Sequence, residues 1–296
     1  MNHHKYSPSS LERSYLCPFS VKGHDLPDVD NEFSLEGTLL HRAVETKNLE
    51  GLNDEQIELV NKCINFLHPL TRGAWDVSFE SKVEIYSNPD REIDDKAEII
   101  SSGSIDCIIL DAEENLNIVD FKFGRIEVES PENNLQLAAY ALATMQAWDV
   151  KKCNAYIFQP RISDKPKMFT FTDPEGLLET IKSIITNCDV KDPVINPGEK
   201  QCQYCKLKQH LKCPALKNEL ATIDKTINLP ELSNEDLTKL YLRANIVDKY
   251  LNAIKEEFKN RIEKIGNCGG YIMKEYEVKE YLVKAGIRKK IVKEKK

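Results

Sequence analysis

An aspartate and a lysine stand two residues apart inside an apolar run, "IVDFKFGR", at residues 118–125. The alternation of the run predicts a β-strand, in which every second side chain lies on the same face. The apolar side chains after Ile118 then share one face, and Asp120 and Lys122 share the other. A carboxylate can bind a cation, and an ammonium beside it can act on a water molecule that the cation holds. Because solvated strand faces often alternate in charge, this pair alone establishes no site.

A second aspartate makes a cation site more plausible. Asp106 lies in "GSIDCIIL", a second predicted strand that a polar turn near residues 112–115 joins to the first. In such a hairpin Asp106 and Asp120 fall nearly opposite one another, on strands about 4.8 Å apart. Two buried carboxylates at that separation repel each other unless a cation lies between them. Mg²⁺ or Mn²⁺, bound by carboxylates and water, fits these ligands.

Two predicted helices carry further candidates. His41 lies in "EGTLLHRAVE" and is able to complete a metal shell, although a lone helical histidine is more often structural. Gln136 and Tyr140 are four residues apart in "NNLQLAAYALA" and therefore share one helical face. A further carboxylate is expected from one of three glutamates that the sequence does not distinguish: Glu45, Glu80 and Glu84.

The cysteines suggest a second metal centre. Cys202 and Cys205 form a Cys-x-x-Cys pair, which puts two thiolates within reach of one metal, and Cys213 follows after seven residues. A proline follows Cys213 and also Cys17, which makes Cys17 the natural fourth ligand. Structural zinc sites gather their ligands locally, so the long separation of Cys17 counts against zinc. Zinc and unligated thiols both remain open on this pattern.

Four short motifs stand in a fixed order along the chain: Gly37-Thr-Leu-Leu-His41, Gly103-Ser-Ile-Asp106, Asp120-Phe-Lys122 and Gln136-Leu-Ala-Ala-Tyr140. In this order they resemble the RecB-like branch of the PD-(D/E)XK nuclease superfamily, over residues 8–216. The resemblance implies an α/β restriction-endonuclease-like core, with a mixed central sheet flanked by helices. One position departs from the family pattern, because Ile105 stands where a proline usually precedes the first aspartate.

The same resemblance implies metal-dependent hydrolysis of phosphodiester bonds in DNA. It assigns the metal to His41, Asp106, Asp120 and the carbonyl of Phe121. It assigns Lys122 to the attacking water. Gln136 and Tyr140 would contact the DNA strand or support the site.

RecB-like nucleases of the AddB type have one cysteine before the nuclease core and three after it, which together hold a [4Fe–4S] cluster. By this resemblance Cys17, Cys202, Cys205 and Cys213 would ligate the cluster, with Zn²⁺ as the alternative. The segments "SSLERSYLCPFSV" and "LSNEDL" also resemble a phage-borne family without an assigned function. That likeness implies a role in phage DNA replication or recombination, in the host cytoplasm.

The chain is expected to divide into a nuclease domain, residues 1–216, and an extension, residues 217–296. The extension begins with a long amphipathic helix over residues 234–265, introduced by Ser233, and continues into a small hairpin and a basic tail. The tail is expected to fray in solvent rather than to bind nucleic acid. The long helix would pack on the nuclease domain or pair with a second chain.

Composition excludes some classes of protein. The chain is 41% hydrophobic and 30% charged, its net charge is −7, and no run approaches the ~20 apolar residues of a membrane span. Its start has no apolar stretch typical of a secretory signal. We therefore expect a cytoplasmic protein that does not enter a membrane.

The sequence predicts a DNA exonuclease that acts on linear single- or double-stranded ends. One alternative is a DNA-end-binding or assembly module that keeps a non-catalytic nuclease fold. A zinc-stabilised interaction protein is another. A homo-oligomer, or a partner protein from replication or recombination, is compatible with each of them.

Overall fold

The computed structural model describes residues 4–28, 32–88, 98–210, 212–215, 233–265, 276–282 and 288–294. The chain forms two compact units, Met1–Leu207 and Lys208–Lys296. The predicted domain boundary after residue 216 falls within a stretch, residues 216–232, that lies outside the described residues. That boundary therefore stays a prediction.

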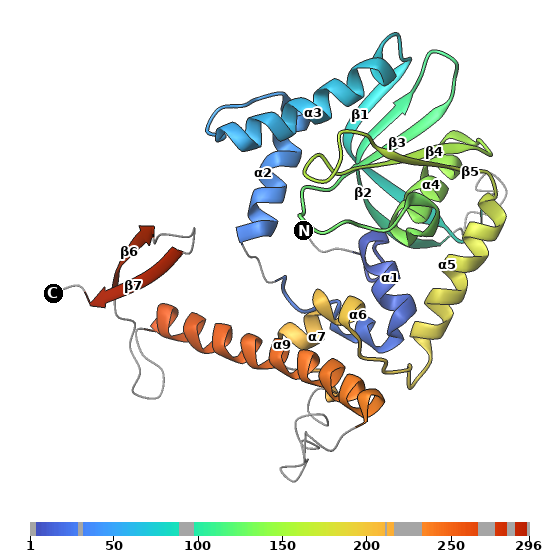
Figure 1. The fold of residues 1–296 in the computed structure, drawn as a ribbon. Coiled ribbons are helices and arrows are strands. Elements are labelled where there is room, and N and C mark those ends of the chain that lie inside the picture. Colours follow the sequence, from blue (N-terminus) through green and yellow to red (C-terminus); the bar gives the residue numbers. More distant parts are fainter. Residues whose placement is uncertain are drawn as a thin grey trace. The chain divides into compact units, whose positions relative to one another are not determined.

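The first unit is built on a five-stranded sheet (Figure 1). Its strands lie in sequence order: β1 (Asp76–Tyr86), β2 (Ile99–Leu110), β3 (Leu116–Phe121), β4 (Cys153–Phe158) and β5 (Lys167–Phe171). Neighbouring strands are antiparallel except for β3 and β4, which are parallel. Parallel neighbours need a crossover, and helix α4 (Leu135–Trp148) provides it. The expectation of a mixed sheet flanked by helices is confirmed.

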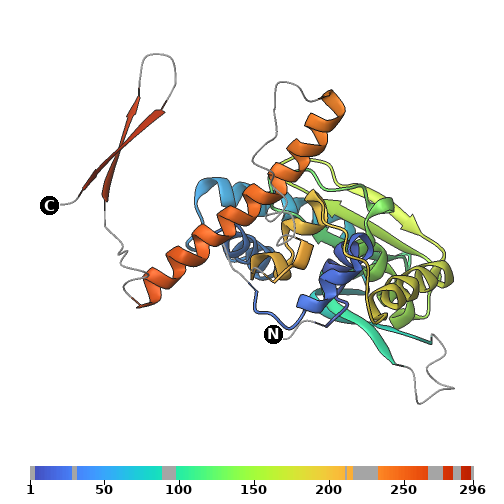
Figure 2. The ribbon, with the colours of Figure 1, turned by 90° about the horizontal axis from the view of Figure 1, so that it is seen from below.

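Helices cover both faces of the sheet (Figures 1 and 2). On one side are α1 (Pro8–Leu16), α4 and α5 (Pro174–Asp189), and on the other α2 (Glu32–Thr46) and α3 (Asp54–Thr71). Every residue of β3 is buried. Ile118 belongs to the apolar core on one side, whereas Val119 and Phe121 belong to the core on the other. Burial on both faces explains why this strand is apolar almost throughout.

Local sequence signals account for two of the helix starts. Asn53 caps α3, and its side chain and that of Gln56 form reciprocal hydrogen bonds with each other's backbone N–H. In the second unit, Ser233 Oγ accepts the backbone N–H of Asp236 at the start of α9 (Asn234–Ile265). The bounds of α9 agree with the prediction.

The end of the chain corrects one expectation. Strands β6 (Tyr276–Leu282) and β7 (Arg288–Glu294) form an antiparallel hairpin. Much of the basic segment that was predicted to fray is thus strand β7, because its backbone pairs with β6. None of the helices within the described residues is long and apolar enough to cross a membrane. The short helices are η1 (Pro18–Gly23), η2 (Pro131–Asn133), α6 (Glu199–Gln203) and α7 (Lys206–Gln209).

The turn between β2 and β3 is held by one carboxylate. Asp111 Oδ1 accepts the backbone N–H groups of Glu113 at 3.0 Å and Asn115 at 2.8 Å, and Oδ2 accepts from Asn117 Nδ2 at 3.1 Å. Partial burial raises the pKa of Asp111, but these hydrogen bonds outweigh it and lower the pKa below its ordinary value. The turn sets the register in which Asp106 and Asp120 meet.

We expect Asp111→Ala to lower the free energy of unfolding by about 1–3 kcal/mol at neutral pH, because several charge-assisted hydrogen bonds are lost. A lowered folded-state pKa means that this stabilisation is full above the unfolded value, about 3.9, and is lost as the pH falls through the folded value. Chemical denaturation of wild type and variant at about pH 7 and about pH 3 measures the loss of unfolding free energy at each pH. The neighbouring Glu113→Ala is the control. An equal loss at both pH values would contradict the assignment.

Candidate active site

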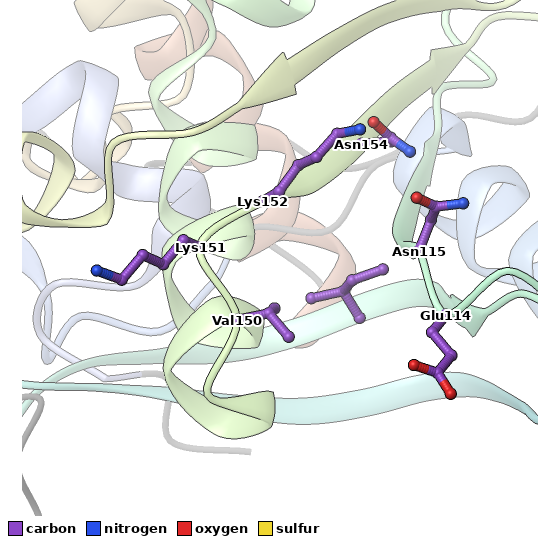
Figure 3. A pocket seen from close by; sticks show the side chains of 7 residues that line it. Glu114, Asn115, Val150, Lys151, Lys152 and Asn154 are labelled. Carbon is purple, nitrogen blue, oxygen red and sulfur yellow. The ribbon is translucent and has the colours of Figure 1, made fainter.

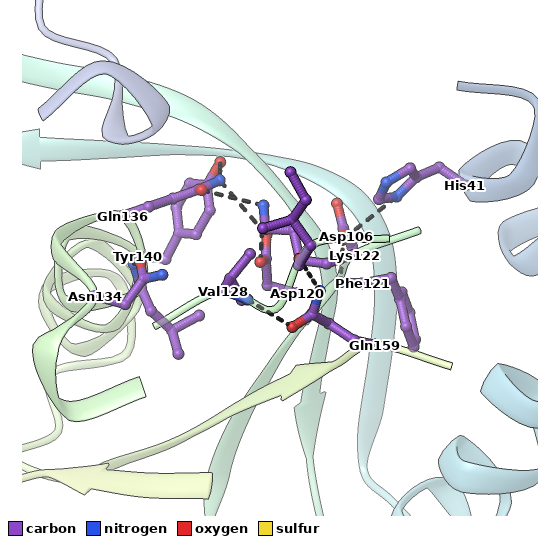
Figure 4. Close-up of polar contacts among 12 residues, drawn as sticks. His41, Asp106, Asp120, Phe121, Lys122, Val128, Asn134, Gln136, Tyr140 and Gln159 are labelled. Atoms are coloured by element: carbon purple, nitrogen blue, oxygen red, sulfur yellow. Dashed lines mark hydrogen bonds and ion pairs between the residues drawn. The ribbon is translucent and has the colours of Figure 1, made fainter. Parts of the chain in front are cut away.

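The two aspartates predicted to face each other do so. Cys107 on β2 pairs with Val119 on β3, so the next residues along the two strands, Asp106 and Asp120, lie opposite one another. Asp120 is 4% exposed. Asp106 Oδ2 accepts the backbone N–H of Phe121 at 2.6 Å (Figure 4). Both carboxylates therefore lie at the carboxyl end of β3, fixed by the sheet.

Lys122 is held between Asp120 and the helix that follows. Its Nζ lies 2.9 Å from Asp120 Oδ2 and donates to Gln136 Oε1 at 3.1 Å (Figure 4). Gln136 Nε2 in turn donates to Tyr140 Oη at 3.4 Å. The backbone N–H of Lys122 donates to Phe158 O at 3.0 Å, which ties it to β4. The structure thus gives Gln136 and Tyr140 a supporting place, and their contact with DNA stays a prediction.

His41 joins the site from α2. Its Nδ1 lies 3.3 Å from Asp106 Oδ2 and 3.9 Å from Glu80 Oε1. The ligand atoms of His41, Glu80 and Asp106 all lie within 4.8 Å of one another, the one group of three with this spacing in the described part of the chain. Two carboxylate oxygens and an imidazole nitrogen suit Mn²⁺, and the carboxylates also suit Mg²⁺. The donor set therefore fits the predicted metal.

The backbone of β1 is distorted to place Glu80. Its φ of 47° is left-handed, and it interrupts the β1–β2 pairing opposite Asp106. Such a conformation in a non-glycine residue costs about 1–3 kcal/mol and is typical of functional sites. Glu84, in contrast, accepts from Lys82 at 2.7 Å and from Tyr86 at 2.8 Å. Of the three glutamates left open by the sequence, Glu80 is the one brought to His41 and Asp106.

The charges at the site are unbalanced. Burial raises the pKa of Asp120, and nearby Asp106 raises it further against the opposing effect of Lys122. Burial and Asp106 also raise the pKa of Glu80. Burial lowers the pKa of His41, but the surrounding carboxylates outweigh it and raise the pKa. Three carboxylates face one ammonium and one imidazole, and a divalent cation would relieve this excess of negative charge.

Two predicted metal ligands, Asp120 and the carbonyl of Phe121, are not members of the group formed by His41, Glu80 and Asp106. The Asp120 carboxylate is paired with Lys122, as described above. The Phe121 side chain is buried and stacks on Phe123, with ring centroids 6.5 Å apart. Ligation by Asp120 and by the Phe121 carbonyl stays a prediction.

The two motif glycines have different surroundings. A Cβ on Gly103 would lie 2.8 Å from Pro8 Cδ, so glycine lets the start of α1 approach β2. A Cβ on Gly37 would meet no atom within 4 Å. Packing within the described structure thus explains the first glycine, and the second leaves open space on α2 near His41.

Three of the four cysteines belong to the first unit. Cys17 follows α1, Cys202 lies in α6, Cys205 precedes α7, and all three are buried. Cys17 Sγ accepts the backbone N–H of Asn196 and Cys202 Sγ that of Gly198, each at 3.4 Å. Cys213 is also buried and belongs to the second unit.

The contacts of two of these thiols bear on a metal site. The backbone N–H groups that donate to the sulfurs of Cys17 and Cys202 are of the kind that tune metal–thiolate clusters. Ligation of a cluster or of zinc by these cysteines stays a prediction.

Sequence reasoning missed two residues beside the site. Gln159, 5% exposed, accepts the N–H of Val128 at 2.9 Å and donates to Ile126 O at 3.0 Å, which pins the loop after Lys122 (Figure 4). Arg161, with 5% of its side chain exposed, pairs with two glutamates. The sequence did contain a signal for these two residues. A helix between two strands implies that the strands are parallel, so the loops that follow β3 and β4 leave the sheet at the same end.

A pocket of about 230 Å³ lies at the opposite end of β3 and β4 (Figure 3). It is lined by Glu114, Asn115, Leu116, Val150, Lys151, Lys152 and Asn154. None of the predicted site residues is among them. The candidate site is therefore distinct from this pocket.

Comparison with known proteins gives a family and distant structural likenesses to solved proteins. The sequence model of a family described as "Protein of unknown function (DUF2800)" matches residues 77–277. The match contains Asp106, Asp120 and Lys122 and leaves out His41 and Cys17. A solved structure titled "Crystal structure of SSO0001" is 14% identical, with a TM-score of 0.37, over 69% of this chain and 84% of that chain. This superposition is too poor to support an inference.

We expect Mn²⁺ to raise the melting temperature, because a cation at this site stabilises only the folded chain. At ten times Kd the stabilisation is about 1.4 kcal/mol. Glu80→Gln should raise the Kd for Mn²⁺ about tenfold, and Asp106→Asn should remove the stabilisation. Glu84→Gln, on the same strand, is the matched control. Equal Mn²⁺ affinity of the Glu80 and Glu84 variants, measured by calorimetry, would remove Glu80 from the site.

Proposed function

The chain belongs to the DUF2800 family, whose description assigns no function, and from its site we propose that it is a metal-dependent deoxyribonuclease of the RecB-like PD-(D/E)XK type. The observation that carries the proposal is the pairing of Asp106 with Asp120, beside a lysine held by Gln136. His41 and Glu80 close the acidic side of the site. Residues from all four sequence motifs thus lie close together at the carboxyl end of β3.

The arrangement supports hydrolysis of a phosphodiester. A bound Mg²⁺ or Mn²⁺ would polarise a phosphoryl oxygen and lower the pKa of a ligated water. His41, Glu80 and Asp106 would hold the ion, with Asp120 as a further ligand. Water would attack phosphorus in line with the departing oxygen, and the P–O bond to that oxygen would break with its electron pair. The water would lose one proton to solvent, and the departing oxygen would take one up, so that a phosphate monoester and a hydroxyl result.

Lys122 would serve this step. Asp120 and Asp106 raise the pKa of Lys122 although burial opposes them, so the group carries a positive charge before substrate binds. A partly buried ammonium stabilises the negative charge that develops on the phosphate more strongly than one in water would. Gln136 fixes its direction through the 3.1 Å hydrogen bond.

Wider features of the proposal rest on resemblance. Action on linear DNA ends, a role in phage replication or recombination, and a place in the host cytoplasm all come from the motif order and from the likeness to phage-borne chains. A [4Fe–4S] cluster on Cys17, Cys202, Cys205 and Cys213 also rests on resemblance, and the burial of all four thiols accords with it. Such a cluster would join the segment before α2 to the segment after α5.

We expect Mn²⁺-dependent cutting of linear DNA, and Lys122→Ala should reduce its rate by at least about 10²-fold, as loss of a transition-state contact does elsewhere. Asp120→Asn should abolish it. Lys82→Ala, a lysine on the exposed part of β1, should cut normally. The assay uses 5′- and 3′-labelled linear DNA beside a circular control. Metal-independent DNA binding without cutting would instead favour the end-binding module.

The protein purified without oxygen should be brown and contain iron and sulfide in equal amounts, because thiolate-ligated iron clusters absorb visible light. Cys202→Ser should lose iron and colour. Cys153→Ser, which changes a buried cysteine at the start of β4 that faces Thr144 of α4, should retain both. Colourless wild type containing one zinc per chain would overturn the cluster in favour of zinc.

A further inference from the structure

Two arginines beside the site converge on one carboxylate. Arg125 follows β3 and Arg161 follows β4, and because these strands are parallel, both loops leave the sheet at the edge that carries Asp120. Arg125 Nη2 lies 3.1 Å from Glu55 Oε1. Arg161 Nη1 makes an ion pair with the same oxygen. Glu55 thus accepts from two guanidinium groups that come from different loops.

Arg161 is unusual for a buried cation. Only 5% of its side chain is exposed, and its Nη2 lies 2.9 Å from Glu36 Oε1. Its Nε is buried and has no hydrogen-bond partner within the described residues. Buried polar groups are almost always paired, and one left over calls for an explanation. A guanidinium held in place with spare donor capacity is suited to a planar or tetrahedral oxyanion.

Glu55 differs from Arg161 in exposure. Its side chain is 56% exposed and that of Arg125 is 70% exposed. The ion pair between Glu55 and Arg125, both exposed, contributes little to stability, and the pair with Arg161 has only the carboxylate exposed. Glu55 also lies in the first turn of α3, where the helix dipole attracts a negative charge. The Glu55 carboxylate therefore lies near three sources of positive potential: Arg125, Arg161 and the N-terminal end of α3.

We propose that Arg125 and Arg161 form a subsite for a backbone phosphate of the bound DNA strand, and that Glu55 occupies it until DNA displaces it. The inference rests on the proposed function, since it names how that site holds its substrate. Without DNA the two arginines are neutralised within the chain. With DNA, a phosphate would offer a separate oxygen to each guanidinium group, whereas both arginines contact the same oxygen of Glu55, Oε1.

The position of the pair suits this role. Glu36, the second partner of Arg161, lies five residues before His41 on α2, which is about 7.5 Å along the helix axis. Arg125 lies three residues after Lys122. Nucleotides of one strand rise about 3.4 Å each along a duplex, so the bound phosphate would be a few nucleotides at most from the cut. The open space beside Gly37 leaves room on the helix for a strand to pass.

The first test uses inorganic phosphate and needs no DNA. Glu55→Gln should bind phosphate at least about fivefold more tightly than wild type, measured by calorimetry in a buffer without other polyanions. Glu58→Gln changes the net charge equally, one turn further along α3, at a residue that pairs with Lys62. Its affinity should stay within about twofold of wild type. Adding Arg125→Gln to Glu55→Gln should remove the gain, and circular dichroism confirms folding of each variant.

The second test measures DNA affinity in EDTA, where no cutting occurs. Arg125→Gln should weaken binding of a fluorescein-labelled oligonucleotide and reduce the slope of log K against log salt by about one. Glu55→Gln should tighten binding more than Glu58→Gln does. Equal behaviour of the Glu55 and Glu58 variants in both tests, in a protein that cuts linear DNA, overturns the subsite alone. Phosphate binding that responds as expected, in a protein that never cuts DNA, retains the subsite and overturns the nuclease.

Discussion

The repulsion between Asp106 and Asp120 is the constraint on which the site depends. The two carboxylates lie opposite each other on adjacent strands of a buried sheet, and Asp120 is almost inaccessible to water. Neither charge is stable there without compensation. Lys122 compensates Asp120 on one side, and His41 approaches Asp106 on the other. A divalent cation would complete the balance, and the nuclease proposal follows from what such a cation does to a phosphate.

The fold brings these groups together through one parallel strand pair. Since β3 and β4 are parallel, α4 must cross over between them, and its first turns place Gln136 beside Lys122. Because β3 and β4 are parallel, the loops that contain Arg125 and Arg161 also leave the sheet at the end where the carboxylates lie. On the other face of the sheet, α2 and α3 pack over Phe121 and bring His41 to the site. One topological feature thus explains both the support of Lys122 by Gln136 and the proposed phosphate subsite.

Much of this arrangement could be predicted from the sequence because it depends on local periodicity. The alternation around Asp120 and the polar turn at Asp111 are enough to place Asp106 opposite, and the helical spacing of Gln136 and Tyr140 puts them on one face. Glu80 could not be selected, because its direction depends on a left-handed backbone within a strand, which composition does not reveal. Arg161 was missed because its partners, Glu36 and Glu55, lie on helices more than a hundred residues away. The basic C-terminal segment looked like a solvated tail, but pairing with β6 made it a strand.

Anomalous X-ray scattering from crystals grown with Mn²⁺ tests the central claim most directly, because it locates the ion without reliance on activity. The account predicts one strong manganese peak within bonding distance of His41 Nδ1 and the carboxylates of Glu80 and Asp106, with Asp120 as a further ligand. If no peak is found there at saturating Mn²⁺, and Lys122 still pairs with Asp120, the result would contradict the account.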